Sequence, residues 1–173
     1  MSQGHAISVL ARAYHRSGRR VYLEAARRAL RLLDVASHAG GVRALCLDRF
    51  IWYEEYPTTP PLFVLNGFIY TLLGLYDLHV IEGENSISTA KKMFDSGMIS
   101  LKTLLPLFDT GSGSFYDLRH FTLGVSPNIA RWDYHATHVN QLYLLAGLDD
   151  DPVFLNTAKR WEGYMQGKRA AHN

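Results

Sequence analysis

Apolar residues recur at intervals of three or four positions along most of the chain, the spacing of a helix that buries one face. This pattern predicts amphipathic helices at residues 5–17, 20–37, 86–105, 131–147 and 153–167. A sixth helix is predicted from Phe63 to Asp77, where the chain is apolar nearly all round, as in a helix buried on both sides. Six helices in three hairpins indicate an all-α fold with short extended hairpin insertions.

The segments between these helices carry turn and strand signals. Val42–Tyr53 alternates roughly between apolar and polar residues, which predicts an extended segment or a short hairpin. Prolines at positions 57, 60 and 61 exclude a helix from residues 54–61 and predict a loop. Residues 109–114 predict a tight turn that leads into an extended Phe115–His120. Ser86 is expected to cap the helix that begins there.

Composition narrows the class of protein without indicating a function. The 173 residues are 47% hydrophobic and 20% charged, which is typical of one globular domain. The single cysteine, Cys46, has no partner for an internal disulfide and is expected to be a small buried side chain. The longest uncharged run, residues 56–76, is interrupted by proline, asparagine and glycine, so it predicts a buried helix rather than a membrane span.

Basic residues are concentrated in the first two predicted helices. Glu24 is the only acidic residue among the first 31, whereas seven arginines fall in that stretch: Arg12, Arg16, Arg19, Arg20, Arg27, Arg28 and Arg31. Such a pattern fits either a solvated helical face or a patch that binds a polyanion. The sequence leaves both interpretations open.

Polar side chains crowd the stretch 131–141, which begins a predicted helix. Four of them lie three or four positions apart, on one helical face: Arg131, Tyr134, His135 and His138. Buried polar groups need hydrogen-bond partners. This face is therefore either solvated surface or the wall of a wet cavity.

Other candidate groups lie in the loops and in the apolar helix. Glu54 and Glu55 stand in the proline-rich loop, where paired carboxylates are most often solvated, although a rigid loop could also position a general base. Asn66 lies inside the apolar helix, where an amide without a partner would cost about 1–3 kcal/mol, so a buried partner or a ligand is expected. Tyr116 is predicted to share a face of its extended segment with His120.

Two other kinds of site are not supported. His135 and His138, with Asp133, could chelate a metal, but no HExxH framework surrounds them. A serine hydrolase is excluded because Gly111-Ser112-Gly113 lacks the spacing of a nucleophile elbow.

Three long motifs identify a family. The runs YEEYPTTPPLFVLNGFIYTLLGLYDL at 53–78, PLFDTGSGSFYDLRHFTLG at 106–124 and RWDYHATHVNQLYLL at 131–145 resemble, in the same order, the C-terminal part of the D-glucuronyl C5-epimerases of heparan sulfate biosynthesis. The resemblance extends from about residue 3 to the end of the chain. It implies that residues 1–173 are a C-terminal catalytic domain of the α/α toroid type. It also implies that the toroid is incomplete, and that the family's membrane anchor and β-rich domains are absent.

The resembled reaction takes a proton from C5 of a glucuronate unit and returns one on the opposite face. By resemblance, Glu55, Tyr134 and Tyr116 are the catalytic residues, with Glu55 and Tyr134 as the acid/base pair. The substrate-binding residues that the resemblance implies are Tyr56, Asn66, Arg119, Arg131, His135 and His138, with the two arginines at the carboxylate and sulfate groups. No metal or redox cofactor is required.

The resemblance also implies partners and a location. The expected partner is a heparosan or heparan sulfate chain in the Golgi lumen, with a homodimer and other enzymes of that biosynthesis as further partners. Nucleic acid is not expected, and membrane contact is expected only through the family's N-terminal anchor. A polysaccharide lyase that eliminates the 4-oxygen, and a non-catalytic glycan-binding module, remain alternatives. Because six helices are few for a toroid, the chain is expected to be a poor enzyme alone, with an uncovered apolar flank at residues 63–76.

Overall fold

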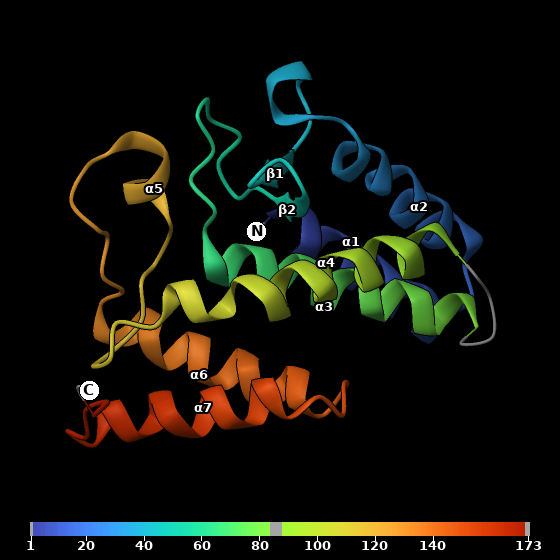
Figure 1. Ribbon diagram of the computed structural model, residues 1–173. Helices are drawn as coiled ribbons and strands as arrows, with labels where there is room; N and C mark the ends of the chain where they lie inside the picture. Colours follow the sequence, from blue (N-terminus) through green and yellow to red (C-terminus); the bar gives the residue numbers. More distant parts are fainter. Residues whose placement is uncertain (1, 84–87, 172–173) are drawn as a thin grey trace. The chain divides into compact units, whose positions relative to one another are not determined.

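The computed structural model describes residues 2–83 and 88–171, and within them the all-α prediction is confirmed as a mainly helical fold (Figure 1). The helices of this described part are α1 (Ser2–Ser17), α2 (Arg20–Asp34), α3 (Leu65–Glu82), α4 (Thr89–Leu104), α5 (Arg119–Leu123), α6 (Trp132–Ala146) and α7 (Pro152–Met165). Contacts divide the chain into two compact units, the first made of Met1–Phe63 with Gly67–Ser100 and the second of Val64–Asn66 with Leu101–Asn173. The toroid stays a prediction.

The first unit begins with α1 and α2, which pack against each other as a hairpin (Figure 1). Its α1 also lies directly on α3, because both helices have glycine at the crossing. A Cβ on Gly74 would lie 2.3 Å from the carbonyl oxygen of Gly4, and a Cβ on Gly4 would lie 2.5 Å from the Cα of Thr71. α2 ends at Asp34, three residues before the predicted end, and a short 3₁₀ helix at Ser37–Ala39 follows it.

The predicted hairpin at residues 42–53 is confirmed. Strands β1 (Arg43–Cys46) and β2 (Phe50–Tyr53) pair antiparallel. Trp52 stacks on Phe68 with 3.8 Å between ring centroids, and the Tyr53 hydroxyl donates to the carbonyl of Met93 at 3.0 Å. Cys46 is buried and free, as predicted.

The apolar helix α3 is buried along most of its length, so the predicted uncovered flank at residues 63–76 is wrong. Phe68, Ile69, Leu72 and Leu75 expose none of their surface. The predicted cap Ser86 lies outside the described residues, whereas the Ser88 hydroxyl accepts the backbone N–H of Lys91 at 3.2 Å, one residue before α4 begins. No helix of the described residues is both long and apolar enough to span a membrane.

The second unit is built on the antiparallel pair α6 and α7, both close to their predicted bounds (Figure 1). The Asp151 carboxylate caps α7 by accepting the N–H of Val153 at 3.0 Å. Lys102, at the end of α4, pairs with Asp149 at 2.7 Å and so ties this end of the pair to the rest of the unit. The core between the helices contains Leu142, Leu145, Phe154, Ala158 and Trp161.

The segment after α4 differs from its prediction. The tight turn is present, closed by a bridge between Asp109 and Ser114, and a second bridge joins Phe115 to Ile129. The extended chain stops before Arg119, where α5 begins, so an extended run to His120 is wrong. The Asp117 carboxylate accepts the backbone N–H of Arg119 at 3.1 Å, and this local bond turns the chain.

Candidate active site

The second unit brings three of the predicted site residues together at the start of α6. The rings of Tyr116 and Tyr134 meet edge-on, with 4.8 Å between centroids and 75° between planes. The guanidinium of Arg131, the residue just before α6, lies 5.6 Å from the centroid of the Tyr134 ring. Both tyrosines are half-buried, and the Arg131 side chain is exposed. The cluster therefore combines two half-buried phenols with a positive charge beside one of them.

Backbone hydrogen bonds hold Tyr116 from two sides. Its N–H donates to the carbonyl of Asn128 at 2.8 Å, and its carbonyl accepts the N–H of Leu65 at 3.1 Å. Leu65 is the first residue of α3, so its N–H has no partner within that helix and is free to bind Tyr116. These two bonds fix the position from which the Tyr116 ring projects.

Asn66 is buried as predicted, with 3% of its surface exposed. Its backbone carbonyl accepts the side-chain N–H of Gln141 at 3.0 Å, which joins the start of α3 to α6. The side-chain oxygen Oδ1 of Asn66 is buried and has no partner among the described residues. The protein thus satisfies the Asn66 backbone but leaves its amide oxygen available to a ligand or a water.

His135 and His138 do not form a solvated surface. They expose 4% and 0% of their surface, and the Nδ1 atom of each lies 2.8 Å from the hydroxyl of Ser114. The Nε2 atom of His135 lies 3.0 Å from the carbonyl of Trp161. Burial, and then the neighbouring His135, lower the pKa of His138 to about 3, so this ring is neutral at physiological pH. This geometry gives no support to a direct contact between either histidine and a substrate.

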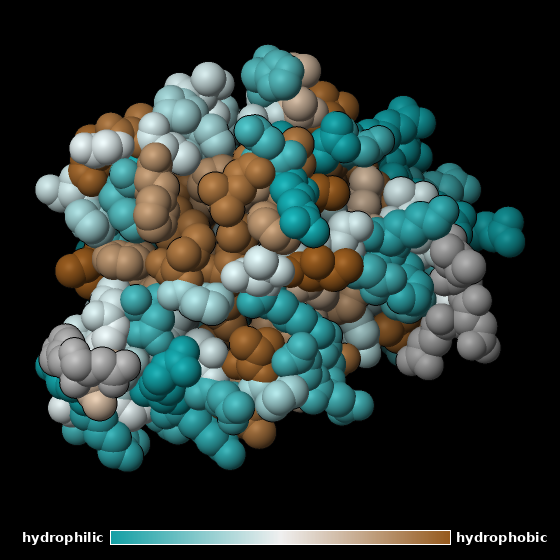
Figure 2. Space-filling view, in the orientation of Figure 1, coloured by the Kyte–Doolittle hydropathy of each residue, from teal (hydrophilic) through white to brown (hydrophobic). Residues whose placement is uncertain are grey.

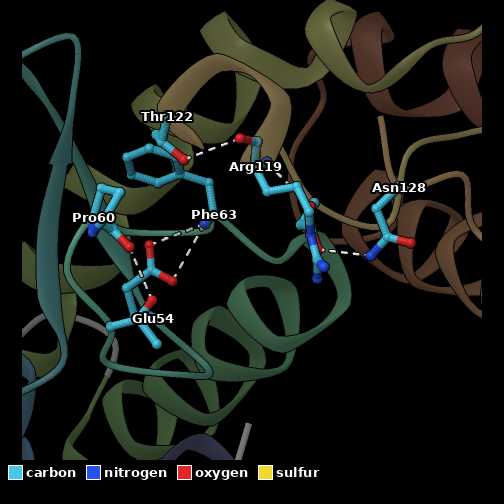
Figure 3. A network of polar contacts seen from close by, with 8 residues as sticks. Glu54, Pro60, Phe63, Arg119, Thr122 and Asn128 are labelled. Atoms are coloured by element: carbon cyan, nitrogen blue, oxygen red, sulfur yellow. Dashed lines mark hydrogen bonds and ion pairs between the residues drawn. The ribbon is translucent and has the colours of Figure 1, made fainter. Parts of the chain in front are cut away.

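Asp117 holds the predicted binding residue Arg119. The Asp117 carboxylate exposes none of its surface and accepts from Arg119 Nε at 2.9 Å and Nη2 at 2.6 Å, and from Asn128 Nδ2 at 2.8 Å (Figure 3). The hydrogen bond that the Arg119 guanidinium donates to Asp117 raises the pKa of Arg119. The Arg119 side chain keeps 35% of its surface exposed. It therefore presents a permanently charged and well-held guanidinium edge to solvent.

In the first unit the two adjacent glutamates have different environments, so of the two interpretations left open for this pair the solvated one is not supported. Glu54 is 3% exposed, and its carboxylate accepts the N–H of Phe63 at 3.1 Å, which closes the proline-rich loop (Figure 3). Glu55 is half-buried, and its Oε2 is buried without a partner in the part of the chain that the structure describes. Tyr56 is 47% exposed. Glu54 is thus structural, whereas Glu55 has a buried acceptor that no group in the described part of the chain uses.

The arginines of α1 and α2 are all exposed. In the view of Figure 2, the surface over α2 is partly hydrophilic. Two of them are paired, Arg12 with Asp77 at 3.0 Å and Arg27 with Glu82 at 2.7 Å. Within the described residues no ion pair involves Arg16, Arg20, Arg28 or Arg31. Both the solvated-face and the polyanion interpretations are compatible with this arrangement.

Known proteins resemble most or all of this chain. A family model described as "D-glucuronyl C5-epimerase C-terminus" matches residues 1–163. D-glucuronyl C5-epimerase of Caenorhabditis elegans is 53% identical over 182 aligned positions, which cover 100% of this chain and 29% of that protein. An uncharacterised protein of Methanocaldococcus jannaschii is 29% identical over 167 positions, which cover 93% of this chain and 50% of that protein. The chain thus spans half or less of the length of these relatives, and it belongs to the family of the D-glucuronyl C5-epimerase C-terminus.

Proposed function

We propose that this chain carries catalytic residues of an isomerase that inverts C5 of D-glucuronate units to L-iduronate in N-sulfated heparosan. The observation that carries the proposal is the edge-on pair of Tyr116 and Tyr134, with Arg131 over the second ring, in a chain of the epimerase family. A half-buried phenol that lies beside a cation, as Tyr134 does, suits proton transfer to and from a sugar acid.

The proposed reaction moves one proton and changes no oxidation state. A base removes the hydrogen from C5, and the electron pair of that bond is delocalised onto the neighbouring carboxylate. An acid on the other face then returns a proton to C5, which restores the carboxylate and inverts the centre. The two bases are Glu55, through its unpaired Oε2, and Tyr134. Tyr116 assists Tyr134 through their ring contact.

Charge that develops on the substrate carboxylate must be stabilised in the transition state. Arg119 and Arg131 are proposed for this role and for the sulfate groups, because each guanidinium is permanently charged and keeps an exposed part. Tyr56, with its exposed phenol, and Asn66, with its unpaired amide oxygen, are proposed as further substrate contacts. His135 and His138 are assigned no direct contact, because both rings are buried.

The setting of the activity is also part of the proposal. Residues 1–173 are proposed to be a C-terminal catalytic domain of the α/α toroid type within a longer protein that works in the Golgi lumen. Its substrate would be the heparosan or heparan sulfate chain, with a homodimer and other enzymes of that biosynthesis as partners. Membership of the family supports the catalytic role, and the coverage of 29% of the C. elegans relative supports a place within a longer protein.

The test follows the hydrogen at C5. The full native protein would be incubated with N-sulfated heparosan in deuterated solvent, and deuterium at C5 and the iduronate content would be measured. Deuterium incorporation with formation of iduronate is expected. Incorporation of no deuterium would leave a glycan-binding module, and an ultraviolet-absorbing 4,5-unsaturated product would indicate a lyase. Either of these results would overturn the proposed epimerase.

A further inference from the structure

One buried hydroxyl lies between two histidines in the second unit. The Ser114 Oγ is 2.8 Å from His135 Nδ1 and 2.8 Å from His138 Nδ1, and Ser114 exposes none of its surface. Ser114 ends the tight turn that begins at Asp109, while the two histidines lie on the buried face of α6. A side chain thus joins this turn directly to the helix that carries Tyr134.

The partners of these rings determine which nitrogen carries each hydrogen. A carbonyl oxygen only accepts, so His135 Nε2 carries the hydrogen that it donates to Trp161. In the neutral ring its Nδ1 is then an acceptor and receives the Ser114 hydroxyl hydrogen. The Ser114 oxygen in turn accepts the Nδ1–H of His138. One chain of hydrogen bonds therefore runs in a single direction from His138 through Ser114 and His135 to Trp161.

This hydrogen-bonded chain joins the same two elements as the tyrosine contact. Ser114 and Tyr116 lie two residues apart in one segment, and Tyr134 and His135 are neighbours on α6. The backbone of the segment is also held, because the Ser114 carbonyl accepts the N–H of Ala130 at 2.8 Å. The Ser114 hydroxyl consequently fixes the separation between the segment and the helix at a point adjacent to the tyrosine pair.

We propose that Ser114 is a positioning residue for the epimerisation, which holds Tyr116 in its edge-on geometry against Tyr134 through bonds to His135 and His138. This inference rests on the proposed function. Ser114 touches neither substrate nor reacting atoms in this role. It acts by setting the place of Tyr116, and small displacements of groups that carry out proton transfer reduce turnover strongly.

Replacing Ser114 with alanine in the full native protein tests this role. Turnover is expected to fall about 10- to 100-fold, with KM changed far less, because the substitution displaces the reacting groups and leaves the substrate contacts in place. Ser112→Ala is the matched control, since Ser112 lies in the same turn but its side chain is exposed and contacts Thr110. Its turnover should stay at the parent level.

A second pair of variants keeps the test decisive if Ser114→Ala folds poorly. His138→Asn places an amide N–H close to the position of Nδ1 and should retain the donation to Ser114, whereas His138→Leu removes it. The asparagine variant is therefore expected to turn over faster than the leucine variant. Nitrogen-15 chemical shifts provide a readout independent of activity: His135 should carry its hydrogen on Nε2 and His138 on Nδ1, and Ser114→Ala should abolish the second preference.

The outcomes separate the two proposals. A parent protein that exchanges no C5 hydrogen would overturn the proposed function, and the positioning role with it, whatever the histidine shifts show. A parent that exchanges normally, together with an unchanged kcat in folded Ser114→Ala, would overturn the positioning role and leave the epimerase intact. The positioning role would also be rejected if Ser114→Ala kept its kcat and only lost stability or gained a higher KM. That result is expected if the Ser114 hydrogen bonds serve the fold alone.

Discussion

A Cβ placed on Gly67 would lie 2.3 Å from the Oε2 atom of Glu55 and 2.8 Å from its Cβ, so only glycine leaves room for this glutamate. Gly67 lies in the first turn of α3, where an alanine would otherwise be favoured. The absence of a side chain at this position is thus what allows the Glu55 carboxylate to rest against the helix. Glu55 Oε2 is the buried, unpaired acceptor that we propose as one of the two bases.

Gly67→Ala is therefore expected to reduce turnover by at least about tenfold, because the new methyl group displaces the Glu55 carboxylate from its place. Helix propensity alone would make this substitution stabilising. Gly163→Ala in α7 is the control, since the nearest atom there is the Cδ of Lys168 at 3.2 Å, on a flexible side chain that can move. Steady-state kinetics on both variants test the prediction, and equal turnover in the two would contradict it.

Removal of either proposed base should abolish most of the activity while the fold persists. Tyr134→Phe keeps the ring and its contact with Tyr116, and Glu55→Gln keeps the shape of its side chain, so neither change creates a cavity. Each is expected to lower turnover by about 10²–10⁴-fold, the usual contribution of a positioned acid or base. Exchange of the C5 hydrogen is measured separately for glucuronate and iduronate units. If the bases serve separate faces, one variant retains exchange in a single epimer but does not interconvert the two.

The buried His138 should make the free energy of unfolding depend on pH. Its pKa falls from 6.5 to about 3 in the folded protein, mainly because burial disfavours the charged ring. As the pH falls below about 6.5, the unfolded chain takes up this proton and the folded chain does not. The free energy of unfolding is therefore unaffected by this group above pH 6.5 and declines as the pH falls toward 3. The slope from this group is at most about 1.4 kcal/mol per pH unit.

Denaturant unfolding at pH 7, 6 and 5 measures this slope. His138→Asn removes the titrating ring and should flatten the decline over this range, even though the variant is less stable at pH 7. His15→Gln, on the exposed face of α1, should leave the slope unchanged. A His138→Asn protein that loses stability between pH 7 and 5 as steeply as the parent would show that another group is responsible.

The arginines of α1 and α2 that form no ion pair among the described residues provide a test of polyanion binding. Replacing Arg16, Arg20 and Arg28 together with glutamine should weaken binding to heparin and reduce its dependence on salt, because fewer counterions are released. The control removes the same charge elsewhere, by glutamine at the exposed positions Lys159, Lys168 and Arg169. Affinity is measured at several salt concentrations. Identical salt slopes for the two triple variants would assign the arginines of α1 and α2 to ordinary solvated surface.

Much of the secondary structure was predictable from the sequence because its causes are local. Helical periodicity located α1, α4, α6 and α7 to within a few residues, and prolines marked the loop before α3. The errors have equally definite causes. Asp117 turns the chain by accepting the N–H of Arg119, so α5 begins where an extended segment was predicted.

Among the site residues, some positions could be predicted from the sequence and others could not. Sequence motifs placed Tyr116, Tyr134 and Arg131 in one site, and the second unit brings these three together. The sequence could not distinguish Glu54 from Glu55, since the path of the loop decides which carboxylate receives the N–H of Phe63.

No pattern in the sequence identified Ser114 as a partner of the histidines. It meets them across 21 and 24 residues of sequence. For the same reason the sequence left open whether the polar face of α6 is solvated or lines a cavity, because the groups that His135 and His138 contact come from other segments of the chain. The helices and the family could be predicted because they depend on local spacing and on motif identity. Which polar groups are buried, and what they bond, follows from the folded structure, because burial and hydrogen-bond partners depend on segments that are distant along the chain.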